Sequence, residues 1–152
     1  MLLRKELIKV GLQGDTSEEV ERNFAKVFVD AGIGKQSYPD AIVKREKDYP
    51  TALPANAFDI AIPHTFSEHV NEEAMGIAVL EHPVEFRQMG SPEILLHPQV
   101  LFMLAIIEPK NQLKTLQNIV KIVQDDALLV RIKEAGNADE IYEVLEPVLR
   151  ID

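Results

Sequence analysis

The chain has 152 residues, of which 46% are hydrophobic and 27% charged, and its formal net charge is −9. These values are typical of one globular domain over residues 1–152, and no apolar run approaches the roughly 20 residues needed to span a bilayer. The acidic excess disfavours nucleic acid and anionic membranes as partners and suits docking against a basic protein. The absence of cysteine excludes disulfides, thiolate metal sites and a cysteine nucleophile. The start, MLLRKELIKV, lacks the apolar core of a signal peptide, so we expect a cytoplasmic protein.

The N-terminal part predicts one strand followed by two helices. The apolar residues of ELIKVGLQ, residues 6–13, indicate a short strand. Thr16 stands three residues before Glu19, the spacing of a capping box, and an amphipathic helix follows until Gly32. A second helix is expected over about residues 38–48, where a proline is tolerated in the first turn.

The middle of the chain predicts strands. FDIAIP (58–63) and AMGIAVL (74–80) are strand candidates, and VEF (84–86) is a weaker one. VLFMLAII, residues 100–107, is an uninterrupted apolar run. Because it lacks alternation, we expect a central strand that is buried on both faces.

The C-terminal part predicts helices. Apolar residues at helical spacing mark one helix that ends near Val123, and another is expected over about residues 126–135. Asn137 stands three residues before Glu140 and predicts the start of a last helix. The order of elements predicts an α/β sandwich with a central mixed sheet and helices on both faces. Loops after strand ends carry the chemistry in such folds.

The four histidines are the first candidates for chemistry. No metal-binding or nucleotide-binding motif accompanies them, and His64 and His69 would point about 140° apart on a helix. His82 and His97 each precede a proline, as is typical of turns. We therefore expect no metal site, and we interpret His69, His82 and His97 as solvated residues.

His64 has a different setting, because it follows a short apolar strand and a proline, in DIAIPHT. The imidazole would stand at a strand end where a partner could reach it, and a neutral imidazole nitrogen is a suitable nucleophile for reversible phosphoryl transfer. A structural histidine that is hydrogen-bonded in a loop fits the same spacing. Local sequence therefore leaves both interpretations open.

Two upstream pairs add chemistry to the phosphoryl-transfer interpretation. Arg45-Glu46 and Pro50-Thr51 would be, by themselves, a charged helix end and a turn. Beside His64 they offer a guanidinium for phosphate oxygens and a threonine hydroxyl.

The order RE, PT and IAIPH resembles the enzyme IIA domains of the fructose–mannitol class in the sugar phosphotransferase system (PTS EIIA type-2). The similarity covers roughly residues 5–148 and includes a strand after the histidine, a V-x-F segment, and a hydrophobic strand that leads into an amphipathic helix. AIVKRE and PKNQLKTL are similar to the galactitol-type group of this class.

The resemblance implies a phosphocarrier in two steps, without metal or organic cofactor. His64 would accept phosphate from the phosphohistidine carrier protein HPr and donate it to a cysteine of the enzyme IIB of a permease, whose membrane component is enzyme IIC. It would attack through the ring nitrogen remote from the side-chain attachment, while the other nitrogen donates to a backbone carbonyl. Arg45 is expected either to stabilise the phosphate charge directly or to anchor Glu46 and the loop. Thr51 and Thr65 are expected to stabilise the phosphate, and Glu46 to support the loop.

The chain also departs from this class. Mannitol- and fructose-type members carry a second histidine at the start of the helix after the long strand, where this chain has Leu113. Asn111 and Gln112 are the candidates to bond the phosphate instead. Two alternatives stay open: a regulatory member of the same fold that is phosphorylated on His64, and an unrelated α/β binding domain whose His64 is structural.

Overall fold

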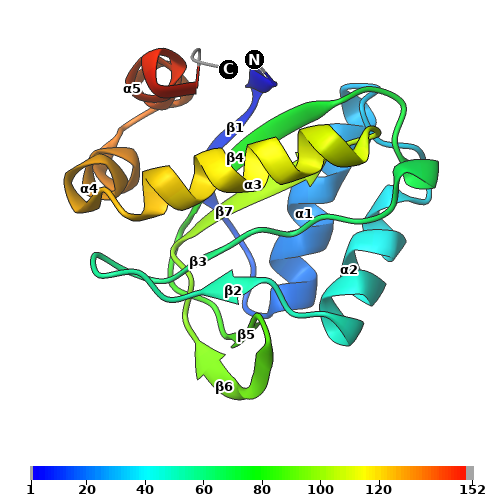
Figure 1. Ribbon diagram of the computed structural model, residues 1–152, viewed down its shortest axis with the longest axis horizontal. Coiled ribbons are helices and arrows are strands. Elements are labelled where there is room, and N and C mark those ends of the chain that lie inside the picture. Colours follow the sequence, from blue (N-terminus) through cyan, green and yellow to red (C-terminus); the bar gives the residue numbers. More distant parts are fainter. Residues whose placement is uncertain (1, 150–152) are drawn as a thin grey trace.

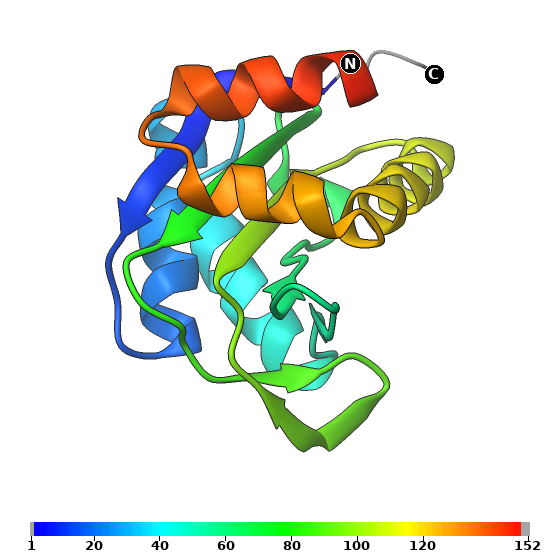
Figure 2. The ribbon, with the colours of Figure 1, turned by 90° about the vertical axis from the view of Figure 1, so that its left-hand side faces the viewer.

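The computed structural model describes residues 2–149, and Figures 1 and 2 show it from two sides. In chain order the elements are β1 (Leu3–Leu12), α1 (Ser17–Asp30), α2 (Tyr38–Asp48), β2 (Ala52–Leu53), β3 (Ile60–Ala61), the 3₁₀ turn η1 (Ser67–His69), β4 (Ala74–Leu80), β5 (Phe86–Gln88), β6 (Ser91–Leu96), β7 (Val100–Ala105), α3 (Pro109–Val123), α4 (Asp126–Glu134) and α5 (Ala138–Leu149). No helix within residues 2–149 is both long and apolar enough to cross a membrane.

The strands form one mixed sheet of seven strands in the order β1-β4-β7-β3-β2-β5-β6. The pairs β1–β4, β7–β3 and β2–β5 are parallel, whereas β4–β7, β3–β2 and β5–β6 are antiparallel. The predicted mixed sheet is therefore confirmed.

The central strands β4 and β7 are buried along their whole length, because helices cover both faces of the sheet. Alternate residues point to opposite faces. Ile77 and Phe102 belong to a core with α3, α4 and α5, whereas Ala78 and Leu101 belong to a second core with α1 and α2. Figure 1 shows α3 crossing in front of the strands, with α1 and α2 behind. The prediction of helices on both faces is confirmed.

Several predicted boundaries were wrong. β1 begins at Leu3, and the segment 58–63 pairs as a regular strand only at Ile60–Ala61. The sequence did not predict β2, which has two residues, or β6. Pro92 interrupts the β6 segment, and a proline argues against a strand except at an edge, which is where β6 lies. Figure 2 shows β5 and β6 as a hairpin at the bottom of the molecule.

Candidate functional site

The sheet brings His64 to the start of α3. β3 and β7 are parallel neighbours, so the segments that follow them leave the sheet at the same edge. β3 continues into Pro63 and His64, and Leu104 N donates to Pro63 O at 3.0 Å. β7 continues into Ile106 and Ile107 and then into α3. The histidine and the first turn of α3, separated by about 45 residues of sequence, therefore border one cavity.

A hydrogen bond determines which ring nitrogen of His64 is free. His64 Nδ1 lies 2.7 Å from Ile62 O. A carbonyl oxygen only accepts, so Nδ1 donates its proton and Nε2 keeps its lone pair. Burial lowers the pKa of His64, partly opposed by the bond to Ile62, and the nearby charge of Arg45 lowers the pKa further. The imidazole is therefore neutral and nucleophilic at Nε2 at neutral pH.

The cavity at His64 has a volume of about 320 Å³ and combines polar and apolar walls. It is lined by Arg45, His64, Thr65, Phe66, Ser67, Ile106, Ile107, Pro109, Gln112, Leu113 and Leu116. Phe66 and Leu113 are both 61% exposed, so apolar side chains stand at the rim of the cavity. An apolar rim around a polar centre is typical of a surface that a protein partner covers.

Arg45 lies between two aromatic rings. Its guanidinium carbon is 4.2 Å from the centroid of the Tyr49 ring and 5.4 Å from that of Phe66. Such contacts hold a guanidinium in place without using its N–H donors. Arg45 Nη1 is one of two buried side-chain atoms in residues 2–149 that have no hydrogen-bond partner. The structure thus places the positive charge of Arg45 on the wall of the cavity of His64, and the buried Nη1 of this side chain has no hydrogen-bond partner.

Glu46 and Thr51 form a support beneath this cavity. The Glu46 carboxylate accepts bonds from Thr51 N at 2.8 Å and from Thr51 Oγ1 at 2.7 Å. Thr51 O in turn accepts from Ile62 N at 3.2 Å. Thr51 is buried and does not line the cavity, and its hydroxyl donates to Glu46. This geometry gives Thr51 a supporting position, and its expected contact with phosphate stays a prediction. The supporting role expected of Glu46 agrees with this geometry.

The remaining predicted residues divide into two groups. Thr65 and Gln112 line the cavity with His64. Asn111 does not, because its Nδ2 donates to Glu73 Oε1 at 2.8 Å on another side of α3. Glu73 Oε2 also accepts from the N–H groups of Ile107 and Glu108, both at 2.9 Å. These donors before α3 are therefore occupied by Glu73, and the expected phosphate contact from Asn111 stays a prediction that this geometry does not favour.

Sequence reasoning missed Tyr49 as a site residue. It follows Arg45 by four residues, the spacing at which side chains meet on a helix, and this was the available signal. Phe66 could not be paired with Arg45 from sequence, because the two lie on different elements. Among residues 2–149, no group of three or more histidine, aspartate or glutamate side chains is placed to hold a metal ion.

The chain is similar to known proteins along most of its length. It is 30% identical over 117 residues to a nitrogen regulatory protein of Klebsiella oxytoca, covering 75% of this chain and 68% of that one. It is 24% identical over 120 residues to a galactitol-specific EIIA component of Escherichia coli K12, covering 78% of this chain and 79% of that one. A 2-O-alpha-mannosyl-D-glycerate-specific EIIABC component of the same strain is 28% identical over 125 residues, which are 76% of this chain but only 18% of that protein's length.

The fold has a solved counterpart in IIA mannitol from Escherichia coli. The two structures match with a TM-score of 0.78 and 22% sequence identity, over 95% of this chain and 99% of the other. The fold of the chain is therefore that of a IIA domain. The sequence model described as "Phosphoenolpyruvate-dependent sugar phosphotransferase system, EIIA 2" matches residues 1–147, and the chain belongs to this family of phosphotransfer components.

Proposed function

We propose that the protein is a phosphocarrier of sugar uptake, with His64 as the residue that is phosphorylated. HPr would supply the phosphoryl group, and a cysteine of the cognate enzyme IIB would receive it. The observation that carries the proposal is the bond from His64 Nδ1 to Ile62 O, which leaves Nε2 free beside a cavity that Arg45 also lines.

The chemistry needs only positioning and charge, as is usual for phosphoryl transfer. Nε2 of His64 attacks the phosphorus of the donor, an N–P bond forms, and the N–P bond of the donor phosphohistidine breaks. The Nδ1 proton stays in its hydrogen bond, so Ile62 O stabilises the positive charge that develops on the ring. In the second step the thiolate of enzyme IIB takes the phosphoryl group, and the ring returns to its neutral form.

Four neighbours would assist this transfer. Arg45 would bind phosphate oxygens through its guanidinium, and Gln112 and Thr65 lie on the same cavity. Leu113, at the position of the second histidine of related members, is apolar and exposed. We propose that it contacts the partner protein and that Gln112 supplies the polar contact on this side.

A labelling experiment tests the proposal. The protein is incubated with labelled phosphoenolpyruvate, enzyme I and HPr, and we expect one acid-labile phosphate per chain. His64→Ala should remove the label, whereas His97→Ala should retain it because His97 is exposed and does not line the cavity. No label on the wild-type chain, or the same label on His64→Ala, would show that the proposal is wrong.

The permease that receives the phosphate is a separate question. We propose a galactitol or related polyol permease with enzyme IIB and IIC components as the acceptor. We also propose that residues 1–152 form a single domain with a cytoplasmic location. The similarity to the galactitol-specific EIIA component supports this choice. The Klebsiella nitrogen regulatory protein, at 30% identity, favours a second candidate: a regulatory protein that uses the same phosphohistidine to change its binding to other proteins.

One measurement separates these two candidates. The phosphorylated chain is mixed with purified enzyme IIB proteins of polyol permeases. Transfer of label to a cysteine of one of them, at a rate comparable to that of loading from HPr, supports the transport function. Stable phosphorylation without transfer to any of them would support the regulatory function.

A further inference from the structure

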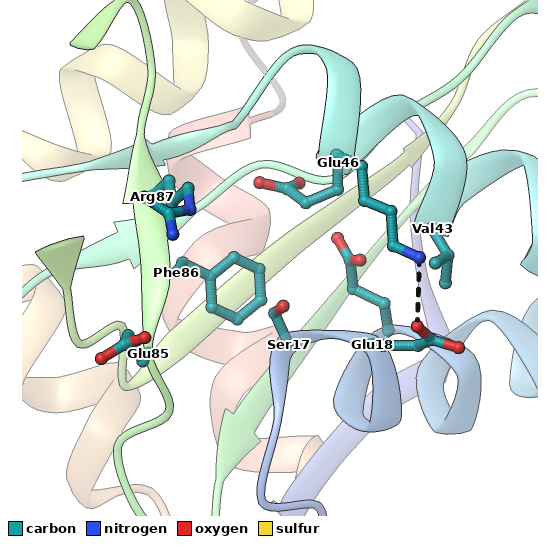
Figure 3. A pocket seen from close by; sticks show the side chains of 9 residues that line it. Ser17, Glu18, Val43, Glu46, Glu85, Phe86 and Arg87 are labelled. Carbon is teal, nitrogen blue, oxygen red and sulfur yellow. Dashed lines mark ion pairs between the residues drawn. The ribbon is translucent and has the colours of Figure 1, made fainter. Parts of the chain in front are cut away.

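Glu46 also lines a second cavity, which contains an acidic pair: the buried Glu21 and the half-buried Glu46. It has a volume of about 220 Å³, lies between α1, α2 and β5, and is lined by Ser17, Glu18, Glu21, Val43, Glu46, Lys47, Glu85, Phe86 and Arg87. Figure 3 shows the side chain of Glu46 reaching into it from α2, with Phe86 and Arg87 opposite and the ion pair of Glu18 with Lys47 at one side.

Glu21 is the unusual member of this group. It is only 1% exposed, and its Oε2 is a buried side-chain atom with no hydrogen-bond partner among the described residues. The carboxyl of Glu46 is its neighbour, and each of the two carboxyls shifts the pKa of the other. Burial, and then the charge of Glu46, raises the pKa of Glu21 well above its usual range. Glu21 is therefore the carboxyl that holds a proton.

Glu46 has contacts that favour its charged form. Burial raises its pKa above the usual value, but hydrogen bonding with Glu21, the bonds donated by Thr51 and the charge of Arg45 oppose that effect. A charged Glu46 beside an uncharged Glu21 is the arrangement in which the two carboxyls do not repel each other. The pair then carries one negative charge.

Hydrogen bonds connect this pair to the histidine. Glu46 accepts from both Thr51 N and Thr51 Oγ1. Thr51 O accepts from Ile62 N, and Ile62 O accepts from His64 Nδ1. A displacement of the Glu46 carboxylate would therefore move the backbone that sets the orientation and tautomer of the imidazole.

We propose that Glu21 is a positioning residue for phosphoryl transfer at His64, because its uncharged carboxyl keeps the half-buried Glu46 carboxylate in place. Glu46 in turn supports the series of hydrogen bonds from Thr51 through Ile62 to His64. This inference rests on the proposed function. Glu21 touches neither His64 nor the cavity that holds it, and it acts only through Glu46.

The charge of the pair also matters to Arg45. One negative charge on the pair leaves part of the positive potential of Arg45 for the phosphate, whereas two negative charges would cancel it and would repel each other. The other charged or titratable groups that face the pair are Glu18 on α1, Tyr38 and Lys47 on α2, and Glu85 and Arg87 at β5. When alkaline pH removes the proton of Glu21, the transfer rate should therefore fall.

The test compares Glu21→Gln with Glu21→Ala in the complete chain. Glutamine keeps the shape and an N–H donor and cannot ionise, so Glu21→Gln should take phosphate from HPr within about threefold of the wild-type rate at neutral pH and should lack the alkaline fall that the wild-type chain shows. Glu21→Ala should be slower by about tenfold or more, because small errors in the position of a reacting group are costly in rate.

Glu18→Gln is the matched control. It makes the same chemical change one turn earlier on α1, on the same cavity, but Glu18 is partly exposed and already paired with Arg22 and Lys47. It should keep the wild-type rate at neutral pH and should still show an alkaline fall, because Glu21 keeps its titratable carboxyl. That fall should begin at somewhat lower pH, since the charge of Glu18 is one of the causes that raise the pKa of Glu21. The double variant Glu21→Ala/Thr51→Val should be no slower than the slower of its two single variants, because both changes interrupt one chain of contacts.

Stability provides an independent readout. Above the usual pKa of a glutamate the folded protein binds more protons at Glu21 than the unfolded chain does, so the wild-type protein loses stability as pH rises. Glu21→Gln should therefore gain stability relative to the wild type as pH rises, and Glu18→Gln should not. If Glu21→Ala does not fold, the pH profiles of the transfer rate in Glu21→Gln and in the wild type still test the positioning role.

The outcomes are distinct. A wild-type chain that takes no phosphate contradicts the proposed function itself. If the wild-type chain is phosphorylated, two results overturn the positioning role alone. One is a Glu21→Gln variant with the same alkaline fall as the wild type, and the other is a folded Glu21→Ala variant that reacts at the wild-type rate.

Discussion

The stacking of Tyr49 on Arg45 gives a prediction whose size can be worked out. Tyr49→Leu removes an aromatic face 4.2 Å from the guanidinium, at a site where the ring is 62% exposed. A cation–π contact at an exposed site contributes about 0.5–1 kcal/mol. If that energy holds Arg45 in its productive position, and a tenfold change in rate corresponds to about 1.4 kcal/mol, the transfer rate should fall by about two- to fivefold.

The assay is the initial rate of phosphate transfer from HPr to the chain, with Arg45→Ala as the reference for complete loss of the guanidinium. That variant should be slower by about 100-fold, as for removal of one preorganised donor. Tyr142→Leu is the matched control, because it removes a similar ring from Lys5, at 5.2 Å, away from the cavity. A wild-type rate in Tyr49→Leu combined with a slow Arg45→Ala would refute the stacking argument.

Three further predictions concern the frame of the site. An NMR titration should place the pKa of His64 below 6.5, and a midpoint at or above 6.5 contradicts this. Because the unfolded chain then binds more protons at this residue than the folded protein does, the protein should lose stability as pH falls below 6.5. Gly76→Ala should destabilise by about 1–3 kcal/mol in chemical unfolding, since a new Cβ would lie 2.6 Å from a carbonyl oxygen of β1 and 2.9 Å from the Phe28 ring; Gly136→Ala, with nothing nearer than 3.7 Å, is the control. Glu73→Ala should speed hydrogen exchange of the two N–H groups before α3 that Glu73 accepts, and unchanged exchange would count against its capping role.

The fold class was readable from the sequence because burial leaves a pattern. The apolar run at residues 100–107 predicted a strand buried on both faces, and β7 is buried at every residue. Thr16 and Asn137 predicted helix starts, and both side chains accept a hydrogen bond from the N–H three residues later. These features are local, so a linear sequence contains them in full.

The short strands were not readable, because their pairing is not local. β2 has two residues and exists only because β3 and β5 lie on either side of it. The edge strand β6 is mostly exposed, so it has no core-facing alternation strong enough to outweigh its proline.

The candidate site divides in the same way. The sequence by itself predicted the candidate nucleophile, since the IAIPH motif and the upstream RE and PT pairs pointed to His64 and Arg45. Only the tertiary structure decided that the Thr51 hydroxyl belongs to Glu46, that Asn111 belongs to Glu73, and that Gln112 lies on the cavity. The physical reason is that a side chain with several possible partners takes the one that the packing of other elements brings within about 3 Å.

Glu21 shows the limit most clearly. Its helical spacing with Phe24 and Phe28 placed it on the buried face of α1, which the sequence alone could have indicated. That its burial leaves it beside a second carboxyl, and through that carboxyl connects it to His64, follows from the packing of α1 against α2 and of β2 against β3. Periodicity in a sequence indicates which side chains are buried, and the contacts between distant segments determine which partners and which protonation state each buried titratable group has.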